Sequence, residues 1–144
     1  MTPDLIALLD GIIPPRPATG AAPDLPGAGG LGLAAAVLDD AAASNRQADL
    51  DEVLGRLPAG FTDLDPRARE AALRTVADAL PRAFASVINM AYTAYYTDPR
   101  VLHALQARTG YQATPPQPGG YPLDEFDPAL LERVRTRPPL WRRA

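Results

Sequence analysis

The sequence of 144 residues contains no cysteine and a single histidine, His103. The missing cysteines exclude a disulfide framework, a thiolate metal site and a cysteine nucleophile. One imidazole is too few for a histidine-based metal site. Long hydrophobic runs are missing too, because no apolar stretch approaches the ~18 residues of a membrane span. The first residues lack a basic region, a twin-arginine pair and a small-residue cleavage site, which predicts a cytoplasmic protein without an export signal.

Lysine is also absent, so all 14 basic residues are arginines, and 17 acidic residues give a formal net charge of −3. General attraction to phosphate is therefore weak, and we expect neither a nucleic-acid partner nor a membrane partner. Five of the arginines follow residue 132, so only the C-terminal tail is locally basic.

Proline is abundant, with 17 residues, which is more than twice the average frequency of about 5%. Prolines and glycines separate segments in which apolar residues recur at helical spacing, and no segment has the alternation of a strand. Three Asp-Pro pairs, at Asp65, Asp98 and Asp127, supply a helix cap followed by a first-turn proline. The expected helices cover residues 3–13, a stretch from residue 31, residues 50–57, stretches from residues 66 and 81, residues 99–109 and a short stretch from residue 128.

These segments predict an all-α fold, a compact single-domain bundle of about six to seven helices with long Pro/Gly-rich loops. We expect residues 1–109 to form the helical core. Residues 110–144 are expected to form an extended segment, rich in proline, glycine and aromatic residues, that carries the short last helix.

Three glycines, Gly27, Gly29 and Gly32, have the G-x-G-x-x-G spacing of a dinucleotide-binding loop, and Glu52 lies about twenty positions downstream. That motif binds a pyrophosphate only where a strand leads into it. Five prolines between residues 14 and 26 exclude such a strand here. We therefore interpret the glycines as a tight turn onto the next helix and expect no bound NAD or FAD in this chain.

Two acidic groups could in principle act as paired carboxylates or hold a hard cation. They are Asp39-Asp40 and the set Asp49, Asp51 and Glu52. The second group is explained more simply as charge at the start of a helix.

His103 lies between Leu102 and Leu105, with no serine or cysteine nucleophile pattern beside it. A single imidazole without a visible partner is more often a packed or interface residue than a catalyst. We predict no catalytic, cofactor-binding or metal-binding residue in this chain. A small enzyme built around His103 is the minor alternative.

The aromatic residues indicate a binding surface. Tyr92, Tyr95 and Tyr96 cannot share one narrow helical stripe, because Tyr95 and Tyr96 are about 100° apart, so at least one should leave the core. Aromatic side chains on proline-rich segments are typical of protein interfaces, although these segments could instead fold back over their own helices. The candidate partner-interface residues are Tyr95 or Tyr96, Tyr111, Tyr121, Phe126, Leu140 and Trp141.

Several short segments resemble a known family in their order along the chain. They are "LLDGIIPP", "PGAGGLG" before a helix, "AYYTDPRVLHAL", and "TGY" followed by "PPQPGGY". Together they span nearly the whole chain, and the succession resembles the gluconate 2-dehydrogenase subunit 3 family. Many members of that family begin with a twin-arginine export signal, which this sequence lacks.

The resemblance implies a small helical accessory subunit that stabilises, matures or escorts a large flavoprotein of the glucose-methanol-choline type. FAD and the chemistry on a sugar, glycoside or sugar acid would belong to that partner. The expected function is therefore a non-catalytic subunit of a cytoplasmic oxidoreductase complex. A stand-alone helical adaptor with an unrelated partner is the alternative.

Overall fold

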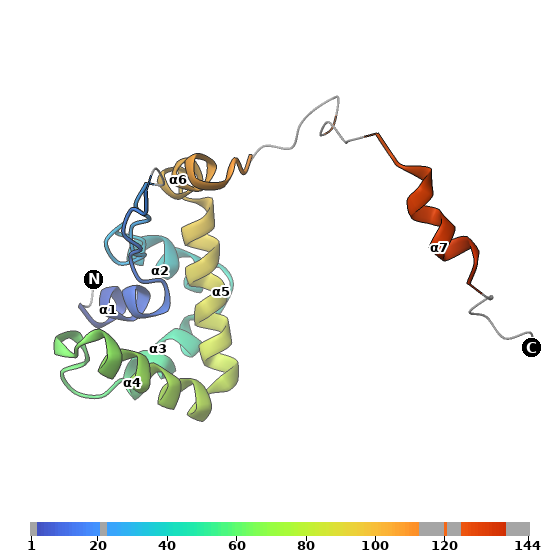
Figure 1. Cartoon of the computed structure of the whole chain (residues 1–144). Coiled ribbons are helices and arrows are strands. Elements are labelled where there is room, and N and C mark those ends of the chain that lie inside the picture. The colour runs from blue at the N-terminus through green and yellow to red at the C-terminus, as the bar shows by residue number, and fades with distance from the viewer. Residues whose placement is uncertain (1–2, 21–22, 113–119, 121–124, 138–144) are drawn as a thin grey trace, which may run out of the picture. The chain divides into compact units, whose positions relative to one another are not determined.

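The computed structural model describes residues 3–20, 23–112, 120 and 125–137. The chain divides into two units, Met1–Ala113 and Thr114–Ala144. Unit 1 contains the helices α1 (Pro3–Ile12), α2 (Ala34–Ala43), α3 (Gln47–Arg56), α4 (Pro66–Ala79), α5 (Pro81–Thr97) and α6 (Pro99–Thr109), and the 3-10 helix η1 (Phe61–Asp63) (Figure 1). Unit 2 contains the 3-10 helix η2 (Pro128–Leu131) and α7 (Glu132–Arg135). The described residues contain no strand, so the predicted all-α class is confirmed.

The Asp-Pro pairs begin helices as predicted. The Asp65 carboxylate accepts a hydrogen bond from the backbone N–H of Ala68 at 2.9 Å, and the Asp98 carboxylate accepts one from Arg100 at 2.8 Å. Each bond satisfies a donor that the first turn of a helix cannot pair internally. Gly110 ends α6 with a φ of 73°, a left-handed conformation that costs glycine little. Local sequence therefore sets the ends of α4 and α6.

The start of α2 differs from the prediction. The sequence pattern places it at Leu31, whereas the helix begins at Ala34. Gly32 has a φ of 72°, which a right-handed helix cannot include. The preceding residues form turns, with the N–H of Leu31 bonded to the carbonyl of Gly27 at 3.1 Å.

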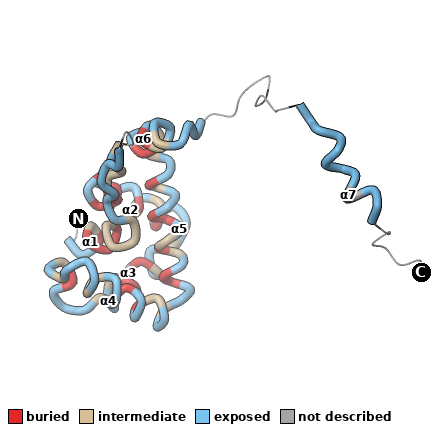
Figure 2. The backbone as a smooth tube through the Cα atoms, viewed as in Figure 1, coloured by how far each residue is buried: buried red, intermediate tan, exposed pale blue. Residues whose placement is uncertain are grey.

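The hydrophobic core of unit 1 is organised around α5, which contacts each of the other α-helices of the unit. One side of α5 buries Val87, Met90 and Ala91 (Figure 2). The apolar face of α1 contributes Leu5, Leu8 and Leu9 to the same cluster. Burying such side chains stabilises a fold by about 1.5–3 kcal/mol each, so the pairing of α1 with α5 fixes the frame that holds the loop between α1 and α2.

Phe61 is a core residue that the sequence analysis did not identify. Its ring is 1% exposed and lies in η1, where the Arg69 guanidinium carbon is 5.7 Å from the ring centroid. Arg69 also donates hydrogen bonds to the carbonyls of Thr62 and Leu64. A lone aromatic residue in a three-residue helix produces no periodic pattern, so its burial depends on the tertiary fold.

The described part of unit 2 consists mainly of one short helical stretch. The short helix expected from residue 128 is present, and it begins with the 3-10 turn of η2 before continuing as α7. The Asp127 carboxylate accepts a hydrogen bond from the N–H of Ala129 at 2.9 Å. In the described part of this unit, all residues with an assigned burial are exposed (Figure 2).

Among the helices that the structure describes, none has the length and apolar character needed to cross a bilayer.

Candidate functional site

The glycine-rich loop between α1 and α2 is closed by a carboxylate of its own chain. Oδ1 of Asp10, on α1, accepts hydrogen bonds from the backbone N–H groups of Gly29 at 2.9 Å and Gly30 at 3.3 Å. In a dinucleotide-binding loop such N–H groups face a phosphate. Here the anion is the side chain of Asp10, so the loop is tied to α1.

The loop approaches α1 so closely that two of its positions have no room for a side chain. A Cβ atom on Gly29 would lie 2.6 Å from the carbonyl oxygen of Ile6 and 2.5 Å from Oδ2 of Asp10. A Cβ atom on Gly27 would meet Oδ1 of Asp10 and lie 2.9 Å from Cδ of Pro15. The predicted role of a tight turn thus applies to Gly32 through its positive φ, whereas Gly27 and Gly29 are required by packing against α1.

Helices α5 and α6 hold the same loop from its other side. The Tyr95 hydroxyl donates a hydrogen bond to the carbonyl of Pro26 at 2.9 Å. Nη2 of Arg100 donates to the carbonyl of Leu31 at 3.0 Å. Burial raises the pKa of the Tyr95 hydroxyl. Segments that are far apart in the sequence, and that carry the family resemblance, are therefore joined by hydrogen bonds in one region, which we call the loop junction.

Asp98 positions Arg100 for this contact. Oδ2 of Asp98 lies 2.7 Å from Nη2 of Arg100, and Oδ1 accepts a further bond from Nε of Arg100. The hydrogen bond from the Arg100 side chain holds the pKa of the Asp98 carboxyl below its usual value. One aspartate therefore caps α6 and also orients the arginine that reaches the loop.

We expect the isolated chain to bind neither NAD nor FAD. The N–H groups of Gly29 and Gly30 already bond to Asp10, and a pyrophosphate would have to displace that carboxylate. A titration of the purified chain should show no saturable enhancement of NADH fluorescence. Stoichiometric flavin absorbance in the purified chain would contradict this prediction. Asp10→Asn is a useful companion variant, because it removes the competing charge while keeping the size of the side chain.

The acidic groups singled out from the sequence do not assemble a cation site in the described residues. Asp40 forms an ion pair with Arg46 at 3.0 Å, and the pKa of its carboxyl is lowered, first by the hydrogen bond from the Ser44 hydroxyl. Asp49 lies in the first turn of α3, as predicted for a charge at a helix start. Asp51, one turn after Gln47 on the same helix, accepts a hydrogen bond from the Gln47 side-chain amide. These carboxylates support local structure.

Glu52, whose spacing from the glycines is that of the acidic residue in a dinucleotide-binding motif, does not join the glycine loop. With Asp49 it lines a hollow of about 440 Å³, next to the Leu80–Ala83 stretch where α5 begins. That hollow includes none of the residues of the loop junction.

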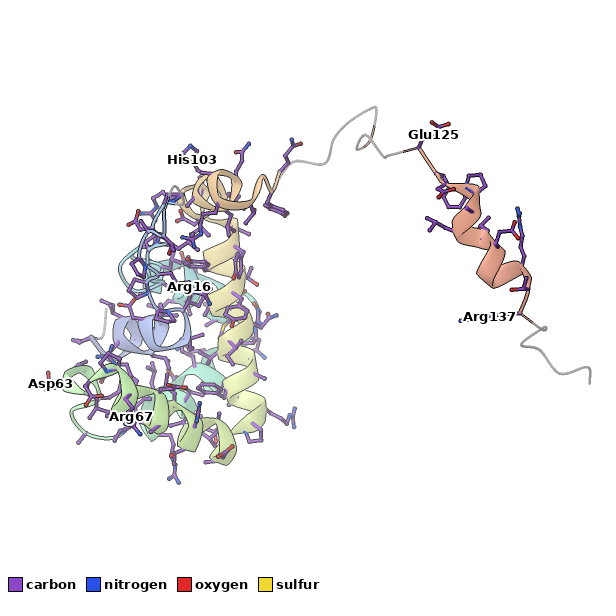
Figure 3. The ribbon with its side chains drawn as sticks, in the orientation of Figure 1. Arg16, Asp63, Arg67, His103, Glu125 and Arg137 are labelled. Atoms are coloured by element: carbon purple, nitrogen blue, oxygen red, sulfur yellow. The ribbon has the colours of Figure 1, made fainter. Side chains whose placement is uncertain are left out.

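His103 lies on the exposed surface of α6, and its side chain points away from the helices of unit 1 (Figure 3). No hydrogen bond joins its imidazole to any other described residue. Within the described ranges, no nucleophile and no carboxylate is hydrogen-bonded to it.

The tyrosines of α5 separate into a buried and an exposed set. Tyr95 is 3% exposed and belongs to the core, so of the two alternatives, Tyr95 or Tyr96, it is Tyr96 that is accessible to a partner. Tyr92 and Tyr96 are 45% and 50% exposed, which confirms that the three rings cannot share the core. The ring of Tyr96 packs edge-to-face on both neighbours, with centroids 5.9 Å from Tyr92 and 5.1 Å from Tyr95.

The other candidate interface residues differ in what the structure shows of them. Tyr111, after α6, and Phe126, before η2, are both exposed. Tyr121, Leu140 and Trp141 lie outside the described residues.

Three adjoining shallow hollows run along the exposed side of α5, and we call them together the aromatic groove. Their volumes are about 390, 200 and 210 Å³. The first and second share Tyr96 and Leu105, and the second and third share Ile12 and Tyr92. The other lining residues are Leu102, Thr109, Tyr111, Ile13, Pro14, Arg16, Leu25, Tyr95, Gly11, Glu70, Leu73, Arg74, Ala77, Phe84 and Ile88.

Sequence reasoning found only part of the aromatic groove. It identified Tyr96 and Tyr111, which line the same hollow. It did not identify Tyr92 as a surface residue, although Tyr92 and Tyr96 are four residues apart and must lie on one helix face. Leu102, Leu105 and Ile12 gave no usable signal, because apolar residues at helical spacing are expected in the core.

No family model matches the sequence, and no curated protein or solved structure shows a significant match to it. The fold and the site themselves define the class of this protein. It is an all-α protein whose candidate site is an exposed aromatic groove beside a hydrogen-bonded loop junction. Contiguous exposed apolar surfaces mark sites of interaction with proteins, membranes or ligands.

Proposed function

We propose that this chain is a non-catalytic accessory subunit that binds a large FAD-dependent oxidoreductase of the glucose-methanol-choline type. The partner would act on a sugar, a glycoside or a sugar acid in the cytoplasm, and it would hold the FAD. The small subunit would stabilise the partner, assist its loading with FAD, or escort it.

The observation that carries the proposal is the convergence at the loop junction. Asp10, the glycines of the loop, Tyr95 and Arg100 come from the segments whose order resembles the gluconate 2-dehydrogenase subunit 3 family. Their hydrogen bonds give this succession a structural reason, because each segment fixes another. This arrangement supports the resemblance as one of fold, and through it the proposed partner.

The aromatic groove supports a binding role in particular. Tyrosine rings bury a large area with few rotatable bonds, which makes them efficient anchors at interfaces. The exposed rings of Tyr92, Tyr96 and Tyr111 lie along the groove. A protein partner would cover them, and the hollows between them would accept its side chains.

Co-expression tests the proposal. A flavoprotein of this type from the same genome should show a higher soluble yield or more FAD per polypeptide when this chain is co-expressed with it. The chain should also co-purify with it. An unchanged yield, unchanged FAD content and no co-purification would contradict the proposal.

The same complex separates the accessory role from an enzyme built around His103. His103→Gln removes the titratable imidazole at an exposed position, so folding should be unaffected. The complex with this variant should keep full oxidoreductase activity. A large loss of activity with an intact complex would place a catalytic group in this chain.

A further inference from the structure

Unit 2, taken by itself, carries three large apolar side chains that are exposed. Phe126, Leu130 and Leu131 are 60%, 70% and 37% exposed. Phe126 immediately precedes Asp127, the cap residue of η2, and Leu130 and Leu131 lie in η2 itself, so the three side chains are close together in the sequence. Exposed apolar clusters of this kind mark binding sites, because leaving them in water is unfavourable.

The local structure presents these side chains at one end of a capped turn. Asp127 caps η2 and Pro128 occupies its first position, so the sequence specifies where the turn begins. The helical stretch runs only from Pro128 to Arg135, and a helix of that length is marginal in water without a partner. Packing of its apolar side chains against another surface would therefore stabilise this helical stretch.

The charge of the chain changes sign beside these residues. Residues 1–132 contain nine arginines and all 17 acidic residues, whereas residues 133–144 contain five arginines and no acidic residue. The formal charge is thus −8 before this point and +5 after it. Arg135 and Arg137 are exposed, and the 3.3 Å pair of Arg135 with Glu132 is itself on the surface. Exposed pairs of this kind contribute little, so the arginines stay free to meet another surface.

We propose that residues 125–137 are a docking segment for a protein surface with an apolar slot and an acidic rim. Phe126, Leu130 and Leu131 enter the slot, and Arg135 and Arg137 meet the carboxylates of the rim. Guanidinium groups suit this role, because their planar fork bonds a carboxylate through two N–H groups. The segment binds the same large subunit as the aromatic groove, so the inference rests on the proposed function for the identity of the partner.

A protein surface fits this segment better than other anionic surfaces. Glu125, Asp127 and Glu132 lie among the apolar side chains, and a phosphate backbone would repel them. Helices that lie in a membrane interface carry basic residues along one whole face and are often 20–30 residues long. Here the basic residues lie only beyond the apolar ones, which suits a slot with acidic groups at one end.

The connection to unit 1 makes two-site binding favourable. Residues 114–124 contain four prolines and two glycines, and a chain of this length spans at most about 40 Å. Once the aromatic groove is bound, a segment tethered at this range meets its own site at an effective concentration in the millimolar range. A modest intrinsic affinity of the segment therefore strengthens the whole complex.

The test compares full-length variants for binding to the flavoprotein. Combined substitution of Phe126, Leu130 and Leu131 by alanine should raise Kd by about 10- to 100-fold at any salt concentration. The pair Arg135→Gln and Arg137→Gln should raise Kd several-fold at low salt and little at high salt, because salt screens exposed charges. Glu132→Gln, at a similarly exposed position, should not weaken binding.

The outcomes separate this inference from the proposed function. If the unmodified chain does not bind the flavoprotein, the proposed function fails and the inference fails with it. If the unmodified chain binds and the alanine variant binds equally well, only the inference is overturned. An alanine variant that melts several degrees lower with unchanged affinity would also overturn it, because the segment would then support its own chain. The inference would also be overturned if the arginine variants lost binding to vesicles rich in phosphatidylserine but bound the flavoprotein as tightly as the unmodified chain.

Discussion

Replacing Gly29 by alanine is expected to lower the free energy of unfolding by about 3 kcal/mol. The new methyl group would lie 2.6 Å from the carbonyl oxygen of Ile6, a backbone atom of α1 that cannot rotate away. Either the loop or α1 must shift, and the 2.9 Å hydrogen bond from Gly29 to Asp10 lengthens or breaks. Thermal denaturation should show a lower melting temperature by about 10 °C for a unit of this size.

Gly30→Ala is the matched control for this experiment. Gly30 is the adjacent residue and also bonds to Asp10. A Cβ atom there would meet only the carbonyl oxygen of Gly27, at an ordinary 3.6 Å. The control should therefore change stability by less than about 0.5 kcal/mol. Equal effects of the two substitutions would show that the loop does not pack on α1 in this way.

The two ends of α6 and the starts of α4 and η2 could be predicted from the sequence, because local interactions determine them. Asp65, Asp98 and Asp127 cap the turns that follow them, and each forms its bond with a residue two or three positions along the chain. Gly110 ends α6 through its own backbone conformation. Such signals need no knowledge of the tertiary fold.

The loop junction could not be predicted in this way, because its bonds join residues far apart in the sequence. The sequence drew attention to the glycines of the loop, and its prolines indicated that no strand leads into them. It gave no indication that Asp10 would occupy the anion site or that Arg100 would reach Leu31. Acidic and basic residues on helices are usually solvated, so their pattern does not identify the few that turn inward.

Which tyrosine of α5 lies on the surface could also not be predicted from the sequence. Helical geometry predicted that one of the tyrosines of α5 would leave the core, and it could not identify which one. The choice depends on the loop: the carbonyl of Pro26 gives the Tyr95 hydroxyl a partner inside the protein, at 2.9 Å. A buried hydroxyl needs such a partner, so the loop junction selects Tyr95 for the core and leaves Tyr92 and Tyr96 on the surface.

Replacing Tyr92 and Tyr96 together by alanine should therefore weaken the complex with the flavoprotein by about 2–3 kcal/mol, or about 30- to 150-fold in Kd. Each ring is about half exposed in the free chain. If a partner covers about 100 Å² of each ring, the transfer of that area from water provides an upper bound of about 2.5 kcal/mol per ring. Isothermal titration calorimetry or biolayer interferometry on the purified pair would measure the loss.

Tyr95→Phe is the companion variant and should show the opposite pattern. It removes the hydroxyl that bonds to Pro26 and leaves a buried carbonyl without that donor, which should cost about 1 kcal/mol of stability. Its ring stays in the core, so the affinity for the partner should be nearly unchanged. The double alanine variant should lose less stability than affinity, because both rings are about half exposed and only Tyr96 packs on the buried ring of Tyr95. Unchanged affinity in the double variant, or a loss of stability as large as its loss of affinity, would show that the aromatic groove is not the binding surface.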